Sequence, residues 1–283
     1  MRTNPIIITG AGHSGTRGLM QVLTKASDVY LGDINNTKRE WEFYRKLATE
    51  VNGRLLGLPC RHNFHIIAPD IFTHFRLTQQ EIDDSVAFMR QKILDNPQES
   101  LPPEDFPLWV IKTPRTTLCL EVWQAVFPNA IFVNLLRDGR DVAASLPDSG
   151  GSLLRRFELW RARVNRIWWY QRQGMSIIDF RYEDLTEPAK LQDLCTALSI
   201  PYRPEMYQQL KMSVGKGRRK MRGLRYERME LLRYGYPKFE QGWQAAINGK
   251  WDRFTGQLSD MTFKLNRKLA NQPKDVQIKQ IGK

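Results

Sequence analysis

Cysteine is scarce in this chain: its 283 residues include three, Cys60, Cys119 and Cys195, and these are scattered. Three isolated thiols supply neither a framework of disulfides nor the grouped ligands of a structural zinc site, so we expect neither. Such sparing use of cysteine is typical of a reducing compartment. The composition therefore predicts a cytoplasmic protein without a bound metal.

Long apolar runs are also missing. No stretch approaches the roughly 18 apolar residues that mark a membrane-spanning helix, so we expect no membrane span. The start of the chain has no signal-peptide pattern. Its first apolar stretch, residues 5–9, is short and β-branched, which is typical of a buried strand.

Acidic residues are in the minority, with 30 Asp and Glu against 43 Lys and Arg, for a formal net charge of +13. Much of the excess lies between Lys211 and Lys238. Three interpretations stay open for it: a solvated basic face, a cationic surface that steers an anionic ligand, or a nucleic-acid-binding module.

Apolar and polar segments alternate in a way that predicts an α/β fold. We expect a mostly parallel central sheet flanked by helices on both faces. The expected strands are 5–9, 108–112, 130–136 and 176–180, and the expected helices 18–24, 79–94, 118–127, 153–172 and 188–198. With 41% hydrophobic residues the chain can bury a large core, so we expect one domain over 1–270 with helical insertions and a flexible polar tail over 271–283.

A glycine-rich loop, Gly10–Arg17, connects the first expected strand to the first expected helix. This arrangement aims backbone N–H groups and a positive helix end at one point, which is typical of a phosphate site. The spacing of Gly10 and Gly15 matches the triphosphate loop G-x-x-x-x-G-K-[ST], but Thr16 and Arg17 replace its lysine and its magnesium-binding hydroxyl. The loop is therefore expected to grip an anion without metal-assisted triphosphate cleavage. A P-loop kinase or nucleotide hydrolase is the alternative, and a turn without a ligand is the simplest one.

A second strand–turn–helix segment carries an arginine and a serine. Arg137 follows the strand 130–136, and Ser145 lies eight residues further on, about two helical turns away. Both side chains could thus reach one phosphate, the arginine as a planar fork and the serine as a neutral donor. The alternative is a salt-bridged helix start in which Arg137 and Arg140 pair with Asp138 and Asp141.

Together these segments resemble the sulfotransferases that use 3′-phosphoadenosine 5′-phosphosulfate (PAPS). His13-Ser14-Gly15-Thr16 resembles the family's 5′-phosphosulfate loop, and 136–146 its 3′-phosphate motif. Lys112-Thr113-Pro114 is similar to the K-x-P element, and Arg181–Leu185 with Pro188 to the R-Y-E-D-L…P segment. The resemblance runs from about residue 5 to 188 and implies a P-loop-like nucleotide-binding fold and a metal-independent transferase. It implies sulfuryl transfer from PAPS to a hydroxyl or amine, with 3′-phosphoadenosine 5′-phosphate (PAP) as product. The donor site that it implies consists of Gly12, His13, Ser14, Gly15, Thr16, Arg17, Arg137, Ser145 and Tyr182.

The same resemblance implies His13 and Lys112 as catalytic cations on the leaving oxygen. Many family members have lysine or arginine where this chain has His13. Because the phosphate and sulfate groups of a bound donor favour the charged imidazole, we expect the pKa of His13 to rise when the donor is bound. A neutral His13 that only hydrogen-bonds the loop is the alternative.

The general base is the open point. Pro114 stands where the cytosolic small-molecule sulfotransferases have histidine, so the chain looks closer to the carbohydrate and tyrosylprotein branches, which use a glutamate after the first helix. Glu40 and Glu42 lie in that region, and we favour Glu40. Weaker candidates for the base are His62, His65 and His74. Sugar, lipid, phenol and peptide acceptors all stay possible.

Overall fold

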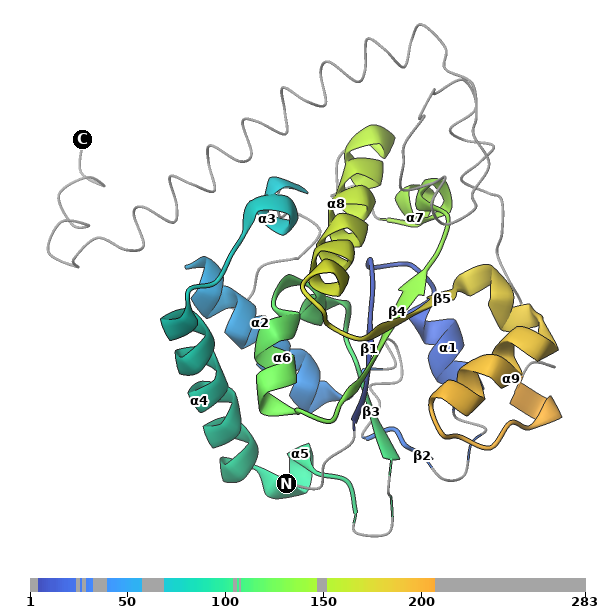
Figure 1. Ribbon diagram of the computed structural model, residues 1–283, viewed down its shortest axis with the longest axis horizontal. Helices are drawn as coiled ribbons and strands as arrows, with labels where there is room; N and C mark the ends of the chain where they lie inside the picture. The colour runs from blue at the N-terminus through green and yellow to red at the C-terminus, as the bar shows by residue number, and fades with distance from the viewer. Residues whose placement is uncertain are drawn as a thin grey trace, which may run out of the picture.

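The computed structural model describes residues 5–23, 26, 29–32, 40–57, 69–103, 106, 108–146 and 152–206. Its centre is a sheet of five parallel strands in the order β2-β3-β1-β4-β5 (Figure 1). The strands are β1 (Pro5–Thr9), β2 (Val29–Tyr30), β3 (Leu108–Lys112), β4 (Ile131–Leu136) and β5 (Ile177–Arg181). The predicted α/β fold with a parallel sheet is confirmed.

Helices cover both faces of the sheet, and β1 shows why. Successive side chains of a strand point to opposite faces, so Ile7 packs into one core while Ile6 and Ile8 pack into another. On the Ile7 side lie α2 (Glu42–Leu56), α4 (Gln79–Asp95), α6 (Leu120–Val126) and α8 (Leu153–Arg172) (Figure 1). On the other side lie α1 (Thr16–Leu23) and α9 (Pro188–Ala197).

Shorter elements complete the described part of the chain. They are α3 (Pro69–His74), α5 (Pro97–Ser100), η1 (Pro114–Leu118), α7 (Gly139–Ser145), η3 (Tyr182–Thr186) and η4 (Pro204–Met206). Helix α7 packs against α8, and a third apolar cluster lies between them.

Two predicted boundaries were wrong because of short helices that start at proline. Residues 96–107, for which no helix or strand was expected, contain α5, in which Pro97 takes the first helical position. The expected helix 118–127 begins at Leu120, because Pro114 opens the separate 3₁₀-helix η1. Proline favours such starts, since its fixed φ suits a helix and its missing N–H would have no partner there.

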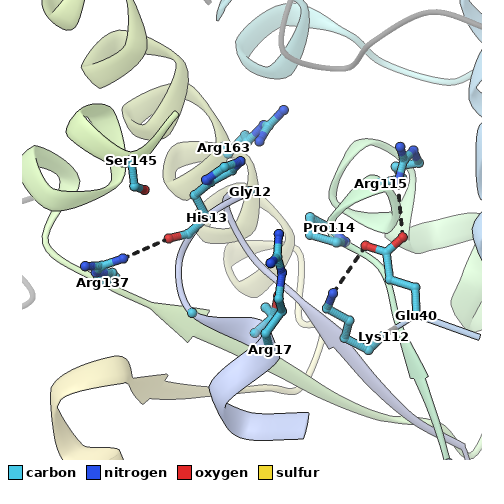
Figure 2. Close-up of a pocket in the computed structure, with 12 residues that line it drawn as sticks. Gly12, His13, Arg17, Glu40, Lys112, Pro114, Arg115, Arg137, Ser145 and Arg163 are labelled. Carbon is cyan, nitrogen blue, oxygen red and sulfur yellow. Dashed lines mark hydrogen bonds and ion pairs between the residues drawn. The ribbon is translucent and has the colours of Figure 1, made fainter. Parts of the chain in front are cut away.

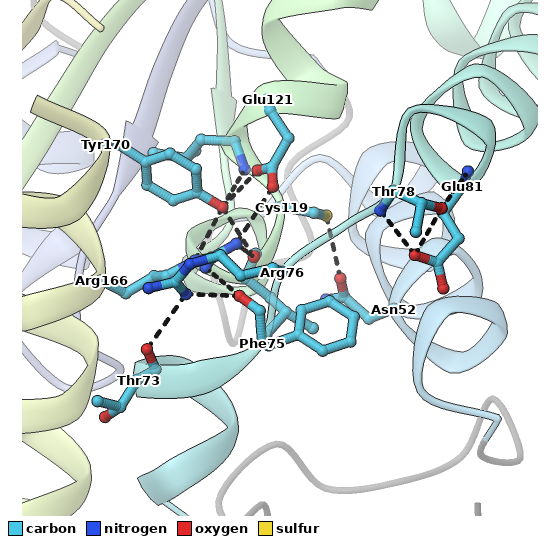
Figure 3. Close-up of polar contacts among 12 residues, drawn as sticks. Asn52, Thr73, Phe75, Arg76, Thr78, Glu81, Cys119, Glu121, Arg166 and Tyr170 are labelled. Atoms are coloured by element: carbon cyan, nitrogen blue, oxygen red, sulfur yellow. Dashed lines mark hydrogen bonds and ion pairs between the residues drawn. The ribbon is translucent and has the colours of Figure 1, made fainter. Parts of the chain in front are cut away.

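A buried polar network joins α8 to η1 and α3 (Figure 3). Arg166 is 1% exposed and donates to the carbonyls of Leu118, at 2.9 Å, and Phe75. The hydroxyl of Tyr170 lies 2.8 Å from the same Leu118 carbonyl, and both side chains contact Glu121. This network holds the end of η1 in place. Because η1 begins two residues after Lys112, the last residue of β3, the network also supports that end of the strand.

No helix in the described ranges is long and apolar enough to cross a membrane. Cys119 and Cys195 are buried thiols that form no disulfide. Three features of the sequence lie outside the described residues: Cys60, the basic segment Lys211–Lys238 and the tail 271–283.

Candidate active site

The carboxyl ends of β1, β3 and β4 open into a cavity of about 490 Å³ (Figure 2). Ligands of parallel α/β sheets bind at this edge, and the volume is in the range typical of small-molecule sites. Its lining residues are Gly12, His13, Gly15, Thr16, Arg17, Glu40, Lys112, Pro114, Arg115, Arg137, Ser145 and Arg163. The set contains five Arg or Lys side chains and one carboxylate, so the cavity is built for an anion.

The loop between β1 and α1 forms one wall, and two positions of it require glycine. Gly10 has φ 132° and Gly15 has φ 97°, a region that side chains other than glycine rarely adopt. A Cβ on Gly15 would lie 2.1 Å from the ring of Tyr182, and one on Gly10 would lie 2.7 Å from the Leu135 carbonyl oxygen. The loop is thus pressed against β4 and η3, and α1 begins at the cavity with Thr16.

His13 lies in the same loop with φ 67°, left-handed backbone that costs a non-glycine residue about 1–2 kcal/mol. Its carbonyl accepts a hydrogen bond from Arg137 Nη1 at 3.3 Å. Burial lowers the pKa of the imidazole, and the nearby charges of Arg17, Arg163 and Arg137 lower it further, while a backbone hydrogen bond at Ser145 opposes them. Without a bound anion, His13 is therefore neutral near pH 7. The protonated state expected with a donor bound stays a prediction.

One end of the cavity, here called the β4 end, consists of Arg137 and Ser145. Arg137 directly follows β4 and is 7% exposed, and its guanidinium lies 4.6 Å above the ring of Tyr182. Ser145 is the last residue of α7, and its hydroxyl donates to the Val142 carbonyl at 3.1 Å. The spacing of eight residues does bring both side chains to one cavity (Figure 2).

Arg140 and Asp138 make the ion pair that the sequence offered as an alternative. Arg140 Nε donates to Asp138 Oδ1 at 2.8 Å, and both side chains are almost fully buried. Asp138 also accepts from the Arg140 backbone N–H and so caps α7. Arg140 therefore supports the helix start and does not line the cavity, whereas Arg137 does.

The other end, here called the β3 end, consists of Glu40, Lys112 and Arg115. Lys112 Nζ lies 3.2 Å from Glu40 Oε1, and Arg115 Nη1 lies 3.4 Å from Glu40 Oε2 (Figure 2). Glu40 and Lys112 are 5% and 4% exposed. Burial lowers the pKa of Lys112 and of Arg115, and the carboxylate of Glu40 opposes both shifts.

Three threonines tie the β3 end to the glycine loop. The Thr9 hydroxyl lies 2.8 Å from that of Thr117 and accepts a hydrogen bond from Thr116 at 3.0 Å. The Thr117 hydroxyl also lies 3.1 Å from the Gly10 carbonyl oxygen, within hydrogen-bond distance. Because all three threonines are fully buried, η1 and the loop keep a fixed relation.

A model of the sulfotransferase family matches residues 5–204. The chain belongs to the sulfotransferase family. Three solved structures show similarity at low identity. Sulfotransferase STF9 from Mycobacterium avium is 13% identical, with a TM-score of 0.45 over 78% of this chain and 68% of that one. A sulfotransferase from Alicyclobacillus acidocaldarius is 16% identical, with a TM-score of 0.42 over 78% and 90%. Sulfotransferase STF1 from Mycobacterium tuberculosis is 17% identical, with a TM-score of 0.40 over 73% and 70%. No match was found among curated proteins.

In this sulfotransferase, most of the predicted site residues share the cavity, and three do not line it. Ser14 is a fully buried residue of the loop itself, and the ring of Tyr182 packs against Gly15 and Arg137. Glu42 is the first residue of α2 and pairs with Arg45 at 2.8 Å. The roles assigned to all of them stay predictions.

The two candidate glutamates lie in different places. Glu40 lies before α2 and reaches the cavity, whereas Glu42, the first residue of α2, does not line it. Of the weaker base candidates, His74 is exposed at the end of α3, and His62 and His65 lie outside the described residues.

Sequence reasoning missed Arg115 and Arg163. Arg115 follows the K-x-P element directly, and this position was a usable signal. Arg163 lies on the buried face of α8 between Trp160 and Ile167, where a charged residue in an apolar stripe points to a special role. Among the described residues, no group of three or more His, Cys, Asp or Glu is arranged to hold a metal.

Proposed function

We propose that this sulfotransferase uses PAPS as donor and transfers its sulfuryl group to a hydroxyl or amine of an acceptor, without a metal ion. The observation that carries the proposal is the shared cavity: the glycine loop, Lys112 and the pair Arg137 and Ser145 all line it, although they come from three separate strand ends. A molecule with two anionic ends fits such an arrangement, because cations lie at both ends of the cavity (Figure 2).

The β4 end would bind the donor's 3′-phosphate. Arg137 presents a planar fork for two phosphate oxygens, and Ser145 adds a hydroxyl donor. The stacking of Arg137 on Tyr182 and its bond to the His13 carbonyl hold the guanidinium in place before a ligand arrives. This preorganisation lowers the entropy lost on binding.

The loop and Lys112 would act on the phosphosulfate. The acceptor oxygen forms a bond to sulfur while the bond from sulfur to the 5′-phosphate oxygen breaks, and negative charge develops on that leaving oxygen. Lys112 and a protonated His13 would stabilise this charge from a largely buried position, where electrostatic stabilisation is strong. In enzymes that cleave triphosphates, a magnesium ion neutralises the developing charge, and here the two cations would do so. The lysine and the magnesium-binding hydroxyl of the triphosphate loop are replaced in this chain by Thr16 and Arg17.

Glu40 would take the proton from the acceptor. Among the described residues that line the cavity it is the one carboxylate, and Lys112 and Arg115 hold it in place from two sides. The glutamate in this position supports the carbohydrate or tyrosylprotein branch, since Pro114 rules out the histidine of the other branch.

Calorimetry with PAP and with adenosine 5′-phosphate tests the proposal. The intact protein should bind PAP about 10- to 100-fold more tightly, because the 3′-phosphate gains hydrogen bonds to a charged group. Arg137→Ala should abolish this difference, whereas Arg161→Ala, on the part of α8 that does not line the cavity, should keep it. Equal affinities of the two nucleotides for the intact protein would refute PAPS as the donor. Turnover should also persist in a chelator, which would stop a kinase.

A further inference from the structure

Arg163 is a cavity residue for which the proposed reaction has no role so far. It comes from the middle of α8, is 3% exposed, and reaches the cavity beside His13 (Figure 2). Its guanidinium lies 5.0 Å from the ring centre of Phe72 in α3. Burial, together with the charge of Arg115, lowers the pKa of Arg163 to about 10, which still leaves it cationic at pH 7.

Arg163 and Arg115 line the same largely buried cavity, so two guanidiniums share one space. Removing charged groups from water is costly unless they are paired. Arg115 is 18% exposed and pairs with Glu40. An anionic group bound in this cavity could accept hydrogen bonds from both planar forks.

The position of the pair relates it to the acceptor. If Glu40 is the base, the acceptor hydroxyl must come within hydrogen-bond reach of it. Arg115 already lies 3.4 Å from Glu40, so it borders the space that the acceptor occupies. The two groups that would bind the 3′-phosphate, Arg137 and Ser145, lie at the opposite end of the cavity (Figure 2).

We propose that Arg163 and Arg115 form a subsite for an anionic group of the acceptor, a carboxylate or a sulfate near the hydroxyl that is modified. The inference rests on the proposed function and deepens it, because it assigns the acceptor to the acidic class. Arg163 is the specificity-determining residue of this subsite, since Arg115 also serves Glu40.

Matched acceptor pairs test the subsite with radiolabelled PAPS. The pairs are 4-hydroxyphenylacetate with 4-hydroxyphenylacetamide, and methyl glucuronide with methyl glucoside. Within the pair that is accepted, the acid should receive label at least tenfold faster at limiting concentration. Arg163→Gln should remove this preference mainly through KM, and Arg163→Lys should restore part of it. Arg161→Gln, two positions away on α8 and paired with Glu158, is the control and should retain the preference.

Other results would overturn the subsite. Equal rates for acid and neutral partner, or no label on any acid while PAP still binds, would exclude an acidic acceptor. A loss of PAP affinity in Arg163→Gln equal to its loss of transfer would assign the residue to the donor. Calorimetry with PAP separates these outcomes from a failure of the proposed function, because an intact protein that does not bind PAP contradicts that function first. Thermal unfolding of each variant shows whether it is folded.

Discussion

The two ends of the cavity are built in different ways. The β4 end comes from one continuous segment, in which Arg137 and Ser145 are joined by a short helix that Asp138 caps. The β3 end combines Glu40 with Lys112 and Arg115, which lie more than 70 residues away in the chain. The first is a local structure and is proposed to bind the donor, whereas the second exists only when the fold is complete and holds opposite charges together in a buried place. We therefore expect substitutions at the β4 end to change binding and substitutions at the β3 end to change turnover.

The largest effect is expected from Glu40→Gln. Loss of a general base commonly lowers the rate by about 100- to 10,000-fold, and the amide can still accept hydrogen bonds from Lys112 and Arg115. Single-turnover transfer should fall by such a factor while PAP affinity stays within about threefold, given that Glu40 contacts no predicted donor-binding group except Lys112.

Glu42→Gln is the matched control for Glu40. Its carboxylate pairs with Arg45 and Lys46 at the start of α2 and does not line the cavity, so transfer should stay unchanged. If Glu42→Gln lowered transfer as much as Glu40→Gln, the assignment of the base to the β3 end would be wrong.

Lys112→Met should have the next largest effect. The methionine keeps an unbranched side chain in the buried space but removes the cation, so we expect turnover to fall by about 100- to 1,000-fold, the usual loss when one group that stabilises developing charge is removed. Glu40 keeps Arg115 as a partner, which limits the destabilisation that follows when a buried ion pair is broken.

The measurement for Lys112→Met is turnover and PAP affinity on the same protein sample, with its thermal unfolding recorded beside that of the wild type. PAP keeps the 5′-phosphate oxygen on which Lys112 is proposed to act, so its affinity should fall as well, but by a smaller factor than turnover. A PAP affinity that falls in parallel with turnover would remove the contrast between the two ends of the cavity.

The contrast between the two ends of the cavity also explains which parts of the fold and of the site could be predicted from the sequence. The β1 and β4 strands and the β4 end follow from short-range patterns: β-branched runs that are buried on both faces, followed by polar turns and a helix start. Glu40 was favoured over Glu42, but no pattern in the sequence showed that its side chain reaches the cavity, because this depends on packing before α2 rather than on helical spacing. Arg163 was missed since a helix pattern gives the buried face but not which part of it meets a cavity.

Helix α2 had a local signal that was not used. Tyr44, Leu47, Ala48, Val51 and Leu55 recur at helical spacing and all face the core. The aromatic residues of this region also belong to the core: Trp41 and Tyr44 lie in the main core with ring contacts to Trp109. The described part of the β3 end is polar and cationic.

His13 lies between the two ends and gives the smallest expected effect, which tests whether it acts as a cation. Its pKa is lowered in the free protein, so bound anions should raise the pKa and PAP binding should take up a fraction of a proton near pH 7. Calorimetry in buffers of different ionisation enthalpy measures this uptake, and subtracting the uptake in His13→Asn isolates the share of the imidazole from that of the phosphates. His13→Ala should lower turnover at least tenfold and leave the affinity for the 3′-phosphate nearly unchanged, because it removes a group that stabilises developing charge. Equal proton uptake by wild type and His13→Asn would mean that the imidazole stays neutral with the nucleotide bound. Of His13 and Lys112, only Lys112 would then be positively charged at the leaving oxygen.

In the free protein, His13 should make the stability depend on pH. Folded His13 binds protons less readily than unfolded His13, so it lowers the free energy of unfolding as the pH falls through about 6.5. The stability of His13→Asn should therefore depend less on pH between 7 and 5 than that of the wild type, which denaturant unfolding at several pH values measures.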